Sequence, residues 1–106
     1  MLNSPAEWPY SSFREFYPFY LSEHARCATR RLHFLGSALA LLCIAALAFT
    51  GDPWWLLAGL VAGYGFAWLS HMTVEKNRPA TFTYPVYSFM GDWVMFWQML
   101  TGRISF

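Results

Sequence analysis

Two long uncharged stretches dominate the pattern of hydrophobic and polar positions along the chain. Residues 34–50 and 54–70 contain no charged side chain, and a turn at residues 51–53 separates them. Each stretch would form a helix of about 26 Å at 1.5 Å per residue, and a bilayer core needs roughly 17–25 residues. Trp54 and Trp55 begin the second stretch, and tryptophan is enriched at membrane interfaces. The pattern therefore predicts a transmembrane helical hairpin.

Two shorter segments are also predicted to be helical. In the first, aromatic side chains recur at i, i+3, i+4 and i+7, the spacing of one helix face: Phe13, Phe16, Tyr17 and Tyr20. This pattern predicts an amphipathic helix on the bilayer surface, capped by Ser11 or Ser12 and kinked or cut short at Pro18. Residues 87–100 form the second candidate, which is either a short span or a re-entrant or interfacial helix. Residues 1–10 are predicted to form a loop without the features of a signal peptide.

Composition supports the membrane interpretation. Only 12% of the residues are charged, while 57% are hydrophobic and 21% are aromatic; soluble domains carry about 25% charged residues. The net charge of +1 gives no electrostatic basis for binding nucleic acid. We expect one all-α membrane domain over residues 1–106, surrounded by membrane lipid. The alternative is a soluble bundle of very apolar helices, which could be an oligomer, because short hydrophobic runs also occur as buried core helices.

The positively charged residues predict how the hairpin is oriented. Arg26, Arg30 and Arg31 precede it, Lys76 and Arg78 follow it, and the turn carries no positive residue. Cytoplasmic loops are enriched in lysine and arginine, so we expect both ends of the hairpin in the cytoplasm. In a bacterium this would be a multi-pass protein of the inner membrane. Arg30 and Arg31 could alternatively bind the carboxylate of a lipid or fatty acid.

The three histidines have a spacing that could bring them together. His33 lies 19 residues before Asp52, and His71 lies 19 residues after it. In an antiparallel hairpin, equal distances from the tip mean equal depth, so these two imidazoles should meet at the cytoplasmic end. Glu75 would share a face with His71 on a continuing α-helix. His24 would point away from His33 on one unbroken helix, so it can join them only if the helix breaks beside it.

These residue types predict a metal site. Histidine nitrogens suit iron, zinc, copper and nickel, and two histidines with one carboxylate form the open site of non-haem iron(II) oxygenases. Glu75 could instead orient a ligand histidine. In the alternative interpretation the histidines are polar anchors at the interface, and Glu75 belongs to a solvated charge cluster. Asp92 is a further functional candidate, because a carboxylate is costly in an otherwise apolar helix, although it could also cap a helix.

Two motifs resemble those of a known family. The first is F-x-x-F-Y-x-x-Y-L-x-x-H, which ends at His24 and is followed nine residues later by His33 in RRLHFLGS. The second is H-x-x-x-E-K-x-R-P-A, which begins at His71. Together they resemble the family of the yeast 2-hydroxy fatty acid dioxygenase, over about residues 13–100. The chain has Ala25-Arg26 where eukaryotic members of that family have Asn-Pro.

The resemblance implies a multi-pass membrane enzyme that needs iron(II) and cleaves 2-hydroxy fatty acids to chains one carbon shorter. Matched position by position, His24, His33 and His71 are the implied iron ligands, and Glu75 is a fourth ligand or a supporting residue. We expect Arg78, or Arg30, to steer the substrate carboxylate.

The sequence therefore supports one main hypothesis and two alternatives. The main hypothesis is an iron(II)-dependent dioxygenase whose partners are membrane lipid, a fatty-acid substrate and dioxygen. The first alternative is a non-enzymatic membrane scaffold or subunit. The second is a metal-dependent lipid hydrolase or hydroxylase that uses the same ligands.

Overall fold

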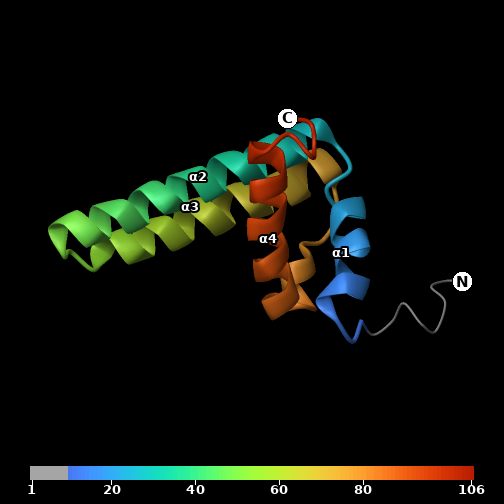
Figure 1. Ribbon diagram of the computed structural model, residues 1–106, viewed down its shortest axis with the longest axis horizontal. Helices are drawn as coiled ribbons and strands as arrows, with labels where there is room; N and C mark the ends of the chain where they lie inside the picture. The colour runs from blue at the N-terminus through green and yellow to red at the C-terminus, as the bar shows by residue number, and fades with distance from the viewer. Residues whose placement is uncertain (1–9) are drawn as a thin grey trace, which may run out of the picture.

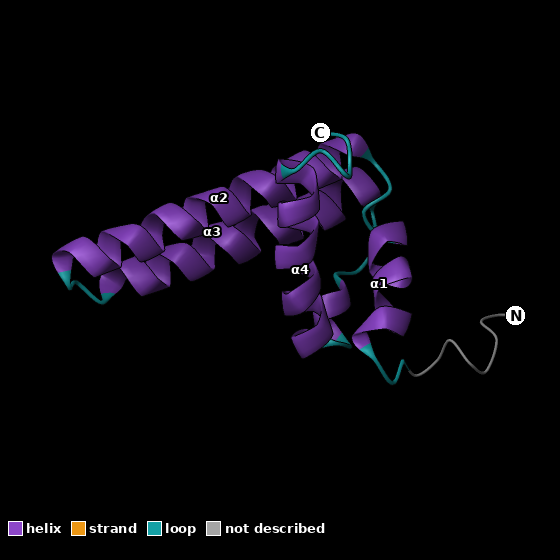
Figure 2. Cartoon of the chain, viewed as in Figure 1, coloured by secondary structure: helices purple, strands orange, loops and turns teal. Residues whose placement is uncertain are grey.

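The computed structural model describes residues 10–106, and every regular element in that range is helical (Figure 2). The elements are α1 (Phe13–Ser22), α2 (Cys27–Thr50), α3 (Trp54–Ser70), a π-helical turn (His71–Glu75), a 3-10 turn (Ala80–Phe82) and α4 (Pro85–Leu100). The predicted all-α class is confirmed. The predicted loop at residues 1–10 lies almost wholly outside the described residues.

Helices α2 and α3 form a long arm. They run antiparallel, side by side, along the longest dimension of the molecule, which measures 51 × 26 × 26 Å (Figure 1). Gly51 ends α2 with a φ of 71°, and its N–H bonds to the Leu47 carbonyl. Glycine is favoured at this left-handed position because it has no Cβ. A Cβ at Gly36 would lie 2.9 Å from the Phe66 Cβ, so the two helices are in close contact.

Helices α1 and α4 lie side by side and cross one end of this arm (Figure 1). Of the two predicted caps, Ser11 and Ser12, the structure has Ser12 as the cap of α1. Its hydroxyl accepts a hydrogen bond from the Glu15 N–H at 3.2 Å. Helix α1 continues for four residues beyond Pro18, so the proline does not cut it short. The buried cluster between these helices includes Phe16, Tyr20, Ala80, Met95 and Met99.

Much of the arm is apolar on its outer surface. Leu42 is 65% exposed and Phe49 is 92% exposed. Helix α2 and the continuous helical segment Trp54–Glu75 are long and apolar enough to cross a membrane, with mean hydropathies of 2.2 and 1.2. Only 22% of each apolar window is buried inside the molecule, so the described residues leave most of that apolar surface uncovered.

Candidate metal centre

Three imidazoles gather where the arm meets α1 and α4. His24 lies between α1 and α2, His33 lies in α2, and His71 begins the π-helical turn after α3. Their exposed fractions are 1%, 5% and 2%. One nitrogen from each lies within 4.8 Å of the other two. Because α1 ends at Ser22 and α2 begins at Cys27, His24 stands in a break of the kind that the sequence required.

Hydrogen bonds assign the proton positions on two of these rings. His24 Nδ1 lies 2.7 Å from the Tyr20 carbonyl oxygen. A carbonyl only accepts, so Nδ1 carries the proton and Nε2 keeps a free lone pair. His71 Nδ1 lies 2.7 Å from Asn77 Oδ1. Asn77 Nδ2 donates to the Glu23 carbonyl at 3.1 Å, which assigns the amide orientation from the network and leaves the Nε2 atom of His71 unprotonated as well.

The two Nε2 atoms of His24 and His71 face each other at 3.0 Å. Two lone pairs at this distance repel each other unless a proton or a cation lies between them. A proton is disfavoured, because burial, followed by repulsion from a charged His71, lowers the pKa of His24 to about 3. Imidazole nitrogens bind zinc at about 2.0–2.1 Å, so two ligands at right angles would lie about 3 Å apart. The pair therefore fits a shared metal ion.

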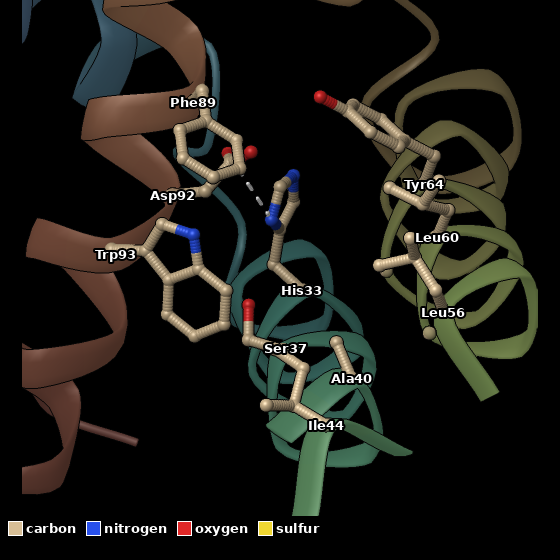
Figure 3. Close-up of a pocket in the computed structure, with 12 residues that line it drawn as sticks. His33, Ser37, Ala40, Ile44, Leu56, Leu60, Tyr64, Phe89, Asp92 and Trp93 are labelled. Atoms are coloured by element: carbon tan, nitrogen blue, oxygen red, sulfur yellow. Dashed lines mark ion pairs between the residues drawn. The ribbon is translucent and has the colours of Figure 1, made fainter. Parts of the chain in front are cut away.

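A carboxylate lies beside the third imidazole. Asp92 Oδ1 is 3.7 Å from His33 Nδ1 (Figure 3), too far for a direct hydrogen bond. The same oxygen accepts a hydrogen bond from the Tyr20 hydroxyl. Burial raises the pKa of Asp92 to about 7, against the opposing effect of the Tyr20 bond. Carboxylates commonly orient metal-binding histidines. The sequence identified Asp92 as a candidate because its helix is otherwise apolar. Tyr20 was predicted only as part of the aromatic stripe, and its hydrogen bond to Asp92 was not predicted.

Glu75 is directed toward the start of α2. Its Oε2 atom accepts hydrogen bonds from the Arg26 N–H at 2.6 Å and from the Thr29 hydroxyl at 2.7 Å. The prediction of a shared face with His71 assumed a continuing α-helix. That premise is wrong, because residues 71–75 form a π-helical turn, whose hydrogen bonds span five residues rather than four. The histidine group found among the described residues does not include Glu75.

The two candidate arginines lie in different surroundings. Arg30 Nη1 donates to the carbonyl oxygens of His24 at 3.1 Å and Ala25 at 2.9 Å. Arg30 therefore stabilises the break that holds His24. Arg78 is exposed, and its guanidinium lies 5.2 Å from the centre of the Phe82 ring. Arg78 lines neither of two cavities that border His33, one of about 20 Å³ and one of about 210 Å³.

A small cavity of about 20 Å³ borders all three histidines, which is room for about one water-sized molecule. Ser88 also lines it. This residue is 3% exposed, and its hydroxyl has no hydrogen-bond partner among the described residues. Buried polar groups are usually paired, so a free hydroxyl beside the imidazoles is a contact point for a small polar group.

Comparison with known proteins supports an enzymatic site. The family described as 2-hydroxy-palmitic acid dioxygenase Mpo1-like matches residues 10–104. The chain belongs to this family. The matched range contains His24, His33 and His71, and it confirms the family suggested by the two sequence motifs. No curated protein and no solved structure matches the chain. The chain is therefore a member of the Mpo1-like family whose structure contains three buried histidines that could hold a metal ion.

Proposed function

We propose that this chain is an iron(II)-dependent dioxygenase that acts on 2-hydroxy fatty acids or closely related lipid acids. The observation that carries the proposal is the pair of unprotonated Nε2 atoms of His24 and His71, 3.0 Å apart. They come from separate segments and are buried, which is costly for unpaired polar atoms. A bound cation would remove that cost. The family description adds the substrate class and the oxidative reaction.

The proposed reaction breaks the bond between C1 and C2 of the substrate. One 2-hydroxy acid and one dioxygen give the acid one carbon shorter, carbon dioxide and water, which balances atoms and electrons without another reductant. Iron, when bound, would supply the activation of dioxygen. The protein would supply the geometry, the exclusion of water and the hydrogen bonds to the substrate.

Each nearby residue has a proposed task. His24, His33 and His71 would hold the metal, with Asn77 and the Tyr20 carbonyl fixing two of the rings. Asp92 borders both cavities, so its carboxylate is placed to accept a hydrogen bond from the 2-hydroxyl group of the substrate.

The charged residues around the site would act at its edge. Glu75 would keep the π-helical turn against the start of α2 through its bonds to Arg26 and Thr29. Arg78 is exposed, and we propose that it draws the substrate carboxylate toward the site from outside. Arg30 would act indirectly, through the backbone of His24.

We further propose that α2 and α3 cross the bilayer with both ends of the arm in the cytoplasm. The apolar outer surface of the arm supports this placement, because charged residues are confined to its ends. Helices α1 and α4 would then lie across the cytoplasmic end (Figure 1). A lipid acid could reach the histidines from the membrane without passing through water.

The test combines metal analysis with a product assay. Wild-type protein and His24→Ala, His33→Ala and His71→Ala variants are purified in lipid nanodiscs and loaded with iron(II) without oxygen. We expect stoichiometric iron in the wild type and at least about a tenfold weaker affinity in each variant. With 2-hydroxyhexadecanoate, pentadecanoate should form only after oxygen is admitted. Leu42→Ala, at a 65% exposed position on α2, is the matched control and should behave as wild type.

The outcomes separate the competing functions. Wild-type protein that holds iron but forms no pentadecanoate after oxygen is admitted would refute the dioxygenase and favour a metal-dependent lipid hydrolase or hydroxylase. Wild-type protein that holds no iron and forms no product would indicate a scaffold or subunit. Retention of full iron binding in all three folded histidine variants would refute the metal site itself. Helical content by circular dichroism establishes that each variant is folded.

A further inference from the structure

A larger cavity lies between the arm and α4. Its volume is about 210 Å³, several times the 30 Å³ or so that one water occupies in the liquid. Its walls are mainly aliphatic and aromatic (Figure 3), and they include Ala40, Ile44, Leu56, Leu60, Phe89 and Trp93. Protein interiors are normally close-packed. An apolar space of this size is therefore a candidate site for an apolar ligand.

This apolar cavity lies next to the small cavity beside the three histidines. His33, Tyr64 and Asp92 line both the apolar cavity and the small cavity beside the three imidazoles. In Figure 3 the His33 ring and the Asp92 carboxylate lie at one end of the apolar cavity, and Ile44 lies farther along α2. Taken together, the two neighbouring cavities therefore have polar groups at one end and mainly apolar walls along the rest of their length. That distribution matches a molecule with one polar head and one apolar tail.

The length of the cavity follows from the positions of the residues of α2 that line it. His33 and Ile44 both line it and are eleven residues apart, which is about 16 Å at 1.5 Å per residue. An extended chain advances about 1.2 Å per bond, a third of the 3.6 Å that the three backbone bonds of one residue span. The cavity therefore accommodates an extended tail of roughly 13 carbons between these two residues.

Small residues keep the cavity open on the α3 side. Gly63 lines it, and a Cβ at this position would meet only the Ala40 Cβ, at 3.8 Å. That is an ordinary van der Waals contact, so the backbone would tolerate a side chain there. A longer side chain would extend into the cavity from its middle, because Gly63 is eight residues, or about 12 Å, from His71 along the helix.

We infer that this cavity binds the hydrocarbon tail of the substrate, a single straight acyl chain of about a dozen carbons or more. The position of its head at the histidines rests on the proposed function. Gly63 and Ala40 set the width of the tail site, Ile44 and Leu56 form its far end, and Trp93 closes it from α4. The site selects long-chain over short-chain 2-hydroxy acids, because each additional buried CH₂ stabilises the complex by about 0.8 kcal/mol.

The test maps the tail by photochemical cross-linking. The probe is a 2-hydroxyhexadecanoic acid with a diazirine near its methyl end, added to the full chain in lipid nanodiscs. We expect labelling at Ile44 and Leu56. Excess 2-hydroxyhexadecanoate should abolish this labelling, and 2-hydroxyoctanoate should compete at least about tenfold less well.

A matched pair of glycine variants tests the cavity itself. Gly63→Leu should lower the labelling at least about tenfold, because one misplaced side chain blocks the tail. Gly65→Leu makes the same change two residues along the same helix, at an exposed position with nothing within 4 Å of the added Cβ, and should label as wild type. If Gly63→Leu does not fold, Trp93→Ala provides a second test, because it widens the cavity on the α4 side. We expect this variant to show a smaller preference for a straight-chain 2-hydroxy acid over a methyl-branched one.

Each result supports or overturns the inference. Labelling of Ile44 that excess acid does not reduce would mean contact with bulk lipid, and labelling confined to residues outside the cavity would place the tail elsewhere. Either result overturns the tail site, as would equal labelling of the Gly63→Leu and Gly65→Leu variants. The readout does not depend on turnover. Competed labelling without product would refute the proposed reaction alone, whereas product without labelling in the cavity would refute the tail site alone.

Discussion

Replacing Asn77 with alanine removes the side chain that orients His71. Asn77 Oδ1 accepts the Nδ1–H of His71 at 2.7 Å, and its Nδ2 donates to the Glu23 carbonyl at 3.1 Å. Without this acceptor, His71 can change tautomer and place a proton on Nε2, the atom that faces His24. It can also rotate about its side-chain bonds. Both changes oppose metal binding, because the ligand nitrogen must carry a free lone pair in the right place.

The size of the effect follows from the two hydrogen bonds. Each contributes about 0.5–1.5 kcal/mol net, so the metal-free protein should lose about 1–3 kcal/mol of stability at most. Removing the outer partner of a metal-binding histidine typically weakens metal affinity by about 10–100-fold. That range corresponds to about 1.4–2.8 kcal/mol, which is the same order as the free energy of the two hydrogen bonds that the substitution removes.

The assay is competition for iron(II) against a coloured chelator without oxygen, with helical content measured on the same samples. Asn77→Asp keeps an acceptor for Nδ1 and should bind iron within a few-fold of wild type. Met72→Ala changes a side chain that is 61% exposed on the same π-helical turn and should have no effect. A folded Asn77→Ala protein with wild-type iron affinity would show that this hydrogen bond does not orient a metal ligand.

Three further predictions concern packing and ionisation. Gly91→Ala should lower stability by about 1–3 kcal/mol in thermal unfolding, because its Cβ would lie 2.9 Å from the Tyr20 ring; unchanged melting would contradict this packing. Gly36→Ala should destabilise the arm by a similar amount, while Gly65→Ala should not, since nothing lies near its Cβ; equal melting of the two variants would rule out the close contact. Burial raises the pKa of Tyr17 to about 12, so the folded state holds this proton more tightly than the unfolded state. Stability should therefore be lost between pH 10 and 12, and a Tyr17→Phe variant with the same alkaline slope would refute this assignment.

The meeting of His33 and His71 was predictable because it depends on counting along two helices. A short turn fixes the register of an antiparallel pair, and residues at equal distances from Asp52 reach the same depth whatever their surroundings. The placement of His24 was predictable only as a condition. The sequence required a break beside it. The structure provides this break at Ala25-Arg26, where Arg30 donates hydrogen bonds to the carbonyl oxygens of His24 and Ala25.

The surroundings of Glu75 were not predictable in the same way. Periodicity arguments assume ideal α-helical spacing, and residues His71–Glu75 form a π-helical turn instead. The roles of Asn77 and Tyr20 were also not predicted from the sequence, although Tyr20 belongs to the aromatic stripe of α1. Each role depends on a contact with another residue of the site, which periodicity does not show. Thr29, which is fully buried against Glu75, is a third example.

The separate origins of the three imidazoles have a consequence for the lifetime of the protein. An ion held by the α1–α2 connection, α2 and the start of the π-helical turn would add to the hydrogen bonds that already join these segments, such as those from Arg26 and Thr29 to Glu75. A ligand that binds only the folded state stabilises it by an amount that grows with its free concentration, about 2.7 kcal/mol at one hundred times the dissociation constant. Cells starved of the metal would then lose the folded protein itself to proteolysis, and its abundance would follow metal supply.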